Sequence, residues 1–317
     1  MSRLVRVELT RLLCRRAVLV LLALAVVLPL AVLGLRLYDT HTQSFDDLVA
    51  ENGSYVLQDV EGCERHPGQY GVAGAENLTL ACQQVIAGWY GNSPLDLVEE
   101  REAGGGVAAI LLITMVLLLA GITFAGHDWN TGSMSNQLLF EPRRERVWLA
   151  KALAVGLLAA VVSLAVLVAF WTGLWAAASV RDLTIPEHAL SAGYKQAVLG
   201  AGFATGSAVF GYALTMLLRS TVGTLGLLFG VGFFCVVIVA GVLGLGGGLE
   251  RAMPWGNFYA YAVGTYEYYD YESCGFGADG SCGAETIGRG ASVVYFSVIW
   301  LVVALPSLLS FRVRDVP

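Results

Sequence analysis

The residues best suited to specific chemistry or binding lie in a polar stretch, 127–146, between two long apolar segments. Its polar, turn-forming and basic members include Asp128, Asn130, Thr131, Glu141, Pro142, Arg143, Arg144 and Arg146. Its large apolar members are Trp129, Met134, Leu138, Leu139 and Phe140. A loop that only fixes membrane topology needs a few arginines and no such apolar side chains. The mixture therefore favours a short amphipathic helix that binds another polypeptide.

Motifs for catalysis are absent from the sequence. There is no H-E-x-x-H, no G-x-S-x-G and no Gly-Lys pair of a phosphate-binding loop. If ATP drives this protein, another polypeptide must bind the nucleotide. The long apolar segments contain no ionisable residues deep within them, whereas ion-coupled carriers usually place such groups at mid-membrane. We therefore expect neither an enzyme nor a secondary transporter.

Four cysteines lie in the two large polar regions outside the apolar segments: Cys63, Cys82, Cys274 and Cys282. An oxidising compartment would allow them to form disulfides, and four cysteines allow three pairings. Our first choice is local, with one bond inside each region; bonds that join the two regions are the alternative. No histidine spacing accompanies them, so we predict no metal site.

The elements that carry these residues are predicted to be membrane helices. The chain of 317 residues is 56% hydrophobic and only 14% charged, against about 25% charged residues in soluble domains. Its charge-free stretches each approach the roughly 20 residues that cross a bilayer. We predict an all-α integral membrane protein with six transmembrane helices, at 17–35, 104–126, 147–180, 196–218, 222–248 and 291–311.

The orientation follows from the basic residues, which concentrate in the short loops on one side of the predicted membrane. The rule that such loops face the cytoplasm places both termini inside. It also places two sizeable loops outside: a cap at 36–103, before span two, and a loop at 249–289, before span six. The preference for Arg over Lys in a chain rich in Ala and Gly suggests a bacterial plasma membrane.

Two segments are expected to lie along the membrane rather than cross it. Residues 1–16 place Val5, Leu9 and Leu12 on one helical face, with arginines off that face, which predicts an interfacial helix whose arginines meet lipid headgroups. A signal peptide is the alternative, although the following apolar run is long and lacks a cleavage site. The aromatic segment 255–263 is either a short re-entrant helix or an ordinary interfacial belt.

The stretch 126–151 resembles the first cytoplasmic loop of the permease subunits of type-2 ABC exporters. The resemblance rests on an acidic residue after span two, a turn of Gly-Thr type, a Leu-Leu pair, a proline, a basic cluster and a lysine. The matching residues are Asp128, Thr131, Gly132, Leu138, Leu139, Pro142, Arg143, Arg144, Arg146 and Lys151. The chain departs from the pattern in the order Thr-Gly and in Glu145, where an arginine is common. The six spans, the amphipathic start and the aromatic segment also resemble that family.

The resemblance implies that residues 130–140 form a coupling helix that sits in a cleft of a separate ABC ATPase subunit. Glu141, Arg143, Arg144 and Arg146 would flank it and contact the ATPase or the lipid headgroups. ATP and Mg would be bound by that partner, and this chain would bind no cofactor and no nucleic acid. A second permease copy or homologue would complete the exporter. Its cargo would be hydrophobic or amphipathic, of the drug, lipid or glycolipid class.

A different class of function remains open, namely a membrane-embedded sensor or enzyme whose external loop binds a ligand. It would require clustered polar groups near one membrane face. The identity of the cargo, homodimer against heterodimer assembly, and binding of another protein by the cap also stay open at this stage.

Overall fold

The computed structural model describes residues 1–317 apart from 42, 236, 238–246, 270–283 and 315–317. The described chain is mostly helical, and a single β-hairpin accompanies the helices in it. The elements are α1 (Ser2–Leu13), α2 (Arg16–Asp39), α3 (Phe45–Asn52), α4 (Ser54–Arg65), α5 (Leu78–Tyr90), α6 (Leu97–Glu102), α7 (Gly105–Asn130), α8 (Ser133–Phe140), α9 (Arg144–Val180), α10 (Ala189–Leu218), α11 (Thr221–Phe233), α12 (Gly247–Ala252), α13 (Pro254–Val263), β1 (Thr265–Tyr269), β2 (Ala284–Gly288) and α14 (Arg289–Val313).

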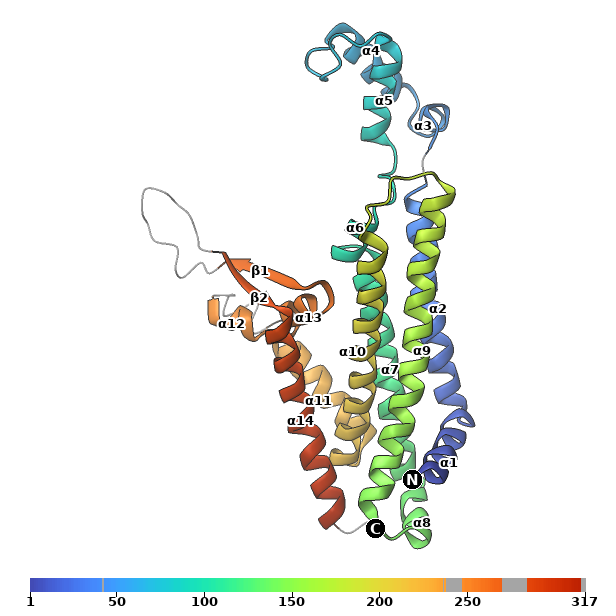
Figure 1. The fold of residues 1–317 in the computed structure, drawn as a ribbon, viewed down its shortest axis with the longest axis vertical. Coiled ribbons are helices and arrows are strands. Elements are labelled where there is room, and N and C mark those ends of the chain that lie inside the picture. The colour runs from blue at the N-terminus through green and yellow to red at the C-terminus, as the bar shows by residue number, and fades with distance from the viewer. Residues whose placement is uncertain (42, 236, 238–246, 270–283, 315–317) are drawn as a thin grey trace.

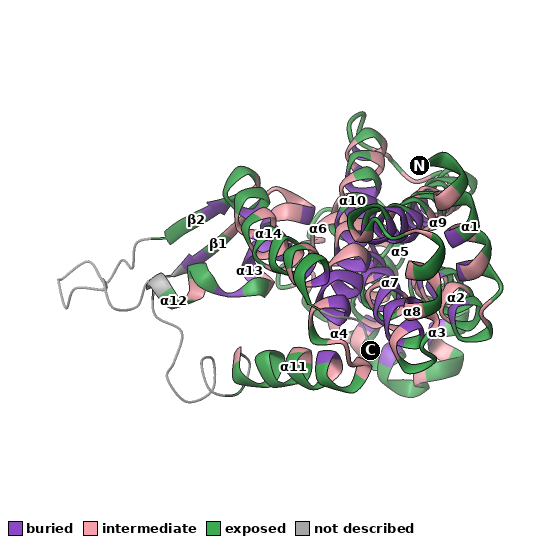
Figure 2. Cartoon of the chain, turned by 90° about the horizontal axis from the view of Figure 1, so that it is seen from below, coloured by how far each residue is buried: buried purple, intermediate pink, exposed green. Residues whose placement is uncertain are grey.

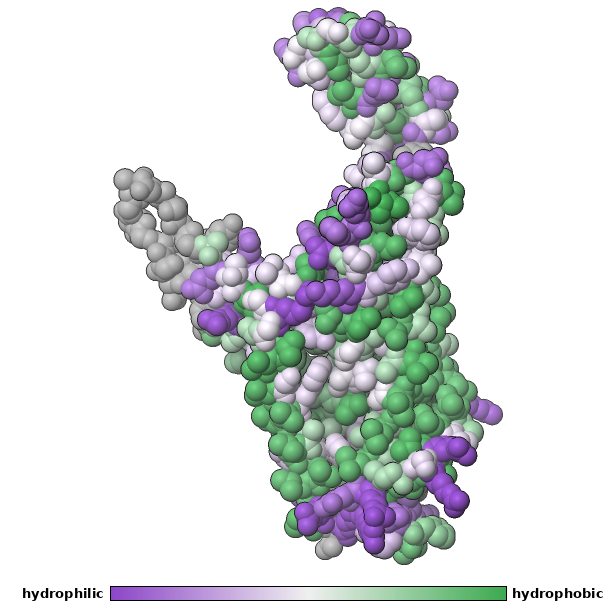
Figure 3. All heavy atoms as spheres, viewed as in Figure 1, coloured by the Kyte–Doolittle hydropathy of each residue, from purple (hydrophilic) through white to green (hydrophobic). Residues whose placement is uncertain are grey.

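Five helical stretches in the described chain are long and apolar enough to cross a membrane. They are Arg16–Asp39, Leu97–Asn130, Arg144–Val180, Ala189–Leu218 and Arg289–Val313. Figure 3 shows the hydrophobic band that they form between two hydrophilic ends. The chain is therefore a helical, multi-pass membrane protein. The predicted fifth span, 222–248, begins as the apolar helix α11, and its residues 236 and 238–246 lie outside the described chain.

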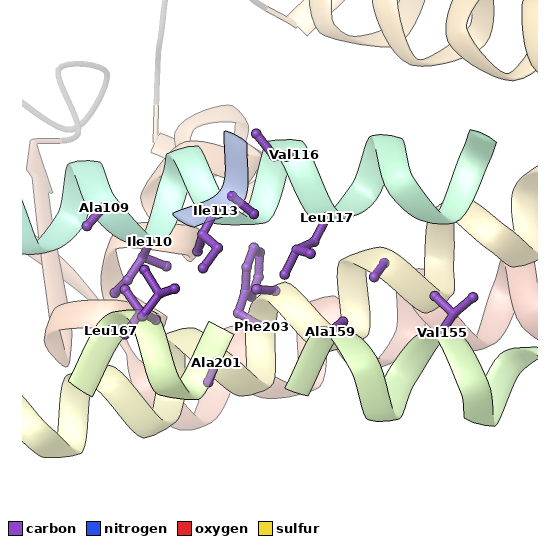
Figure 4. Packing of buried hydrophobic residues seen from close by; sticks show 14 of the residues in the cluster. Ala109, Ile110, Ile113, Val116, Leu117, Val155, Ala159, Leu167, Ala201 and Phe203 are labelled. Carbon is purple, nitrogen blue, oxygen red and sulfur yellow. The ribbon is translucent and has the colours of Figure 1, made fainter. Parts of the chain in front are cut away.

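The core of the bundle lies where α7, α9 and α10 pack together. Figure 4 shows Ile110 and Leu117 of α7 among the buried side chains of this layer, with Leu167 of α9 and Phe203 of α10. Close approach of α7 to α10 depends on Gly121, because a Cβ there would lie 2.1 Å from the carbonyl oxygen of Ala208. Figure 2 shows the contrast with α11, which is mostly exposed. The packed core thus includes the helices on either side of α8.

The two ends of the bundle differ in what they carry. Figure 1 places the start of α1, the end of α14 and the short helix α8 at one end, which we call the terminal end. Helices α3, α4 and α5 stand beyond the opposite end, which we call the cap end. The segment predicted as an external cap is therefore a separate small helical unit.

The cap is held together by a disulfide and a small apolar cluster. Cys63 of α4 and Cys82 of α5 are bonded, with a Cα–Cα distance of 5.7 Å, and both are buried beside Val56, Val60 and Ile86. The local pairing predicted for this loop is confirmed. The other predicted pair, Cys274 with Cys282, lies outside the described residues.

The segment before α14 contains more structure than an aromatic helix alone. Helix α13 covers the predicted segment 255–263, and β1 and β2 follow as an antiparallel hairpin in which Tyr266 pairs with Ile287. Tyr268 and Ile287 bury themselves against Ala260 of α13. The predicted all-α class describes most of the described chain, and this hairpin is a local addition that forms because alternate side chains of the two strands pack on α13.

Candidate functional site at the terminal end

Helix α8 is the candidate functional element, and local sequence defines both of its ends. Gly132 adopts a left-handed conformation with φ of 66°, which separates α8 from α7. Glu141 is extended, as expected for a residue that precedes a proline, so the helix stops before Pro142. The predicted coupling helix, 130–140, therefore begins too early: Asn130 is the last residue of α7, and α8 starts at Ser133.

The apolar side chains of α8 divide between the bundle and the solvent. Met134 is buried in the bundle core, and Leu138 packs against it. Leu139 and Phe140 instead have 81% and 91% of their surface exposed. These two adjacent, almost fully exposed apolar side chains form a small apolar surface at the terminal end that a partner could cover.

Beneath α8 lies a buried cluster of charges that joins α1, α7 and α9. Glu8, Asp128 and Lys151 are all fully buried. The Lys151 Nζ atom lies 2.9 Å from Glu8 Oε2 and 2.5 Å from Asp128 Oδ2. Arg15 adds a second ion pair to Asp128 and donates a hydrogen bond of 2.7 Å to the Phe124 carbonyl oxygen.

The ring of Phe124 and the hydroxyl of Ser133 complete the surroundings of these charges. The Arg15 guanidinium and the Lys151 ammonium lie 4.7 Å and 5.2 Å from the ring centroid, where its π-face attracts cations. Ser133, the first residue of α8, donates a hydrogen bond of 2.7 Å to Asp128 Oδ1. Buried polar networks whose members are satisfied hold one arrangement rigidly. Asp128 therefore ties the start of α8 to the end of α7 and to Lys151 of α9.

This cluster adds to one expectation from the sequence and corrects another. The predicted span 147–180 carries a fully buried ionisable residue, Lys151, near its terminal end. Because Lys151 is only the fifth residue of that span, the expectation that no ionisable residue lies deep within a span is not contradicted. The arginines of α1 were expected to meet lipid headgroups, yet Arg11 and Arg15 both turn to Asp128. The reason is that α1 packs against α9, which gives its polar face protein partners. One signal was present in the sequence: Glu8 shares the apolar stripe of α1 with Leu12, which lies one turn further on.

The basic residues after α8 are divided between structural contacts and solvent. Arg144 donates hydrogen bonds to the Phe311 carbonyl oxygen, at 3.5 Å, and to the Arg314 carbonyl oxygen at the end of α14. Glu145 lies 3.1 Å from Arg312. Arg143 and Arg146 are exposed. The structure thus gives Arg144 a role in joining α9 to α14, and leaves Arg143 and Arg146 available for a partner.

The remaining predicted residues of this segment have local contacts. The Thr131 hydroxyl donates to the His127 carbonyl oxygen within α7, at 2.8 Å. A Glu141 carboxylate oxygen accepts from the backbone N–H of Arg143 at 3.4 Å. Across the described chain, no three His, Cys, Asp or Glu side chains gather as a metal site would require.

Comparison with known proteins adds no relative. No protein-family model, curated protein or solved structure matches the chain. The geometry of the terminal end therefore has to support any assignment of function. It shows a short helix with an exposed apolar tip, fixed to helices of the membrane bundle by buried charges. Such an arrangement can receive a force from a partner and pass it to the bundle.

Proposed function

We propose that this chain is the membrane-spanning permease subunit of a type-2 ABC exporter, in which a separate ATPase subunit binds ATP and Mg and docks on α8. In this proposal the terminal end faces the cytoplasm, the cap faces the outside, and α11 with the residues after it completes a sixth span. Two permease chains, identical or homologous, and two ATPase subunits would make up the transporter in a bacterial plasma membrane.

The observation that carries the proposal is that one end of α8 is exposed while its other end is held by hydrogen bonds to the bundle. Leu139 and Phe140 are exposed, as a docking surface needs, while Ser133 and Asp128 fix the other end of the same helix. The class of partner, an ABC ATPase, is inferred from the resemblance of residues 126–151 to the coupling loop of the family. Without that resemblance, the geometry would support a docking site for a protein of unspecified class.

A mechanical role follows from the connections of α8. Its N-terminal end is joined to α7 through Gly132, and its C-terminal end leads within a few residues into α9. A movement of the partner that displaces α8 would therefore displace the terminal ends of both membrane helices as rigid bodies. The buried ion pair between Asp128 of α7 and Lys151 of α9 keeps these ends together during such a movement.

The nature of the cargo is inferred from the membrane-facing surface. A groove of about 650 Å³ runs between α7 and α11, and Met115, Leu119 and Phe229 are among its apolar lining residues. An apolar groove accommodates a hydrophobic or amphipathic molecule without leaving charges unpaired. We therefore favour export of a drug-like, lipid or glycolipid molecule.

The experiment that tests the proposal is affinity purification of the full chain in mild detergent from its own host, followed by ATPase measurement. We expect a nucleotide-binding subunit in stoichiometric amount. The double variant Leu139→Ala/Phe140→Ala should lose it while the chain remains folded. Val180→Ala is the matched control, because Val180 is equally exposed, at 84%, but ends α9 at the cap end. Purification without any nucleotide-binding protein would contradict the proposal.

One observation favours the second class of function, a ligand-binding sensor or enzyme. Tyr70 and the exposed Trp89 stack on each other in the cap with ring centroids 5.3 Å apart, and the outer face of Trp89 leaves aromatic surface that a ligand could cover. This function predicts that Trp89→Ala abolishes ligand binding in a chain that has no nucleotide-binding partner. The same purification therefore separates the two classes.

A further inference from the structure

Helix α8 has little packing of its own to hold it in place. It is eight residues long, and Met134 is its buried residue. A helix this short is unstable in isolation, and the burial of one side chain adds only a small part of the stability that it needs. Leu138 adds partial apolar packing, and we expect side-chain hydrogen bonds to neighbouring elements to supply the rest of what fixes the orientation of α8.

Those hydrogen bonds come largely from α1. The Arg11 guanidinium donates to Gln137 Oε1 at 2.9 Å and to Ser133 Oγ at 3.1 Å. Gln137 donates in turn to a carboxylate oxygen of Glu8. Ser133 and Gln137 are four residues apart, so they lie on one face of α8, and that face is turned to α1.

The α1 side of this contact is itself anchored in the bundle. Glu8 binds Lys151 of α9 at 2.9 Å, and Arg11 lies 3.3 Å from Asp128 of α7. Leu12, one turn after Glu8, is buried in the core. A continuous set of charge-assisted hydrogen bonds thus runs from α9 and α7 through α1 to α8, and such bonds are stronger than those between neutral groups.

We propose that Glu8 and Arg11 are positioning residues that set the orientation of α8, so that α1 is a working part of the coupling element and not merely a membrane anchor. The contact of Glu8 and Arg11 with Gln137 and Ser133 is called the α1–α8 clasp below. Its consequence for coupling rests on the proposed function. Its effect on the position and stability of α8 does not.

Hydrogen exchange of the full chain in detergent tests the clasp without any partner. Arg11→Gln and Gln137→Leu each remove the central contact, from opposite sides, and Gln137→Leu adds no unpaired buried charge. Both should accelerate exchange in α8 on the order of tenfold, while α7 and α9 keep their protection. Arg11→Lys, which keeps the charge, should restore part of the protection. Arg6→Gln is the matched control, because Arg6 is an exposed arginine of the same helix.

The double variant Arg11→Gln/Gln137→Leu decides whether the two residues act through one contact. If they do, its α8 exchange equals that of the single variants. Unchanged α8 exchange in both single variants would overturn the proposal. So would acceleration spread evenly over α7 and α9, since that reports a loss of overall stability.

A transport assay then adds the functional consequence. Arg11→Gln should lower the amount of substrate moved per ATP hydrolysed while the ATPase partner stays bound. If no ATPase partner exists, the proposed function fails, but the exchange result still shows whether α1 positions α8. If the partner is bound and transport per ATP is unchanged although α8 is loosened, the role of the clasp in coupling is refuted.

Discussion

Asp128→Asn is the substitution to which the buried charge cluster should be most sensitive. Asp128 accepts from Lys151 at 2.5 Å and Ser133 at 2.7 Å, and it pairs with Arg11 and Arg15. Three cations face two carboxylates in the cluster, so its net charge is +1. Loss of the Asp128 charge leaves those cations with Glu8 alone and raises the net charge to +2. Lys151→Met instead brings the net charge to zero.

The magnitude follows from the burial of these groups. Removal of one partner of a buried ion pair costs about 3–5 kcal/mol of the free energy of unfolding, because an uncompensated charge stays buried. In large domains, each kcal/mol shifts the melting temperature by roughly 2–4 °C. Asp128→Asn should therefore lower the melting temperature by roughly 6–20 °C. Lys151→Met should lower it less, because each carboxylate keeps an arginine partner.

The assay is thermal unfolding of the purified chain in detergent, followed by tryptophan fluorescence. Glu61→Gln is the control, because Glu61 forms an exposed pair with Arg65 in the cap, and such pairs contribute about 0–1 kcal/mol. A melting temperature for Asp128→Asn within the range of this control would refute the reasoning. So would a larger fall for Lys151→Met than for Asp128→Asn.

Three further predictions concern the cap and the bundle core. Replacing Cys63 and Cys82 by serine should destabilise the cap by about 3 kcal/mol, given a separation of 19 residues, and limited proteolysis should then cut between them. Gly121→Ala should destabilise the bundle by about 1–3 kcal/mol or more, because its Cβ would lie 2.1 Å from a carbonyl oxygen of α10; thermal unfolding measures this. The hydroxyl and backbone N–H of Ser44 hold the pKa of Asp47 below its usual 3.8. The Asp47 carboxylate therefore stabilises α3 above that pH and stops doing so as pH falls through the lower, folded-state pKa; an NMR titration of Ser44→Ala should show the pKa raised.

Five of the six predicted spans correspond to long apolar helices of the described chain. They could be predicted from the sequence because the bilayer requires a minimum length of apolar residues in each span. The ends of these helices could not be predicted, since a helix can extend beyond the apolar stretch that crosses the membrane. The predicted span 196–218 is observed as Ala189–Leu218, a helix that begins seven residues earlier than predicted and includes Lys195 in its first turns. The hairpin was missed although Thr265–Tyr269 alternates polar and aromatic residues, a pattern typical of strands.

The candidate site was only partly predictable, for a related reason. Turn chemistry at Gly132 and Pro142 marks the ends of α8, and the apolar pair Leu139 and Phe140 is visible as sequence. The pairing of Asp128 with Arg11 and Arg15 is not visible, because these arginines lie more than 110 residues away and meet it only through packing of α1 on the bundle. Glu8 lies in a basic segment that was predicted to lie along the membrane interface, and that prediction gave no reason to expect a buried carboxylate there.

We propose that a nucleotide-binding partner contacts α8 and moves it. The most direct test of this proposal is photo-crosslinking in intact cells from a photoreactive phenylalanine analogue placed at position 140. We expect a crosslink to a nucleotide-binding subunit, and we expect it to disappear when the analogue is moved to position 180 at the cap end. Crosslinks to lipid alone, or labelling of position 140 from outside the cell, would contradict it.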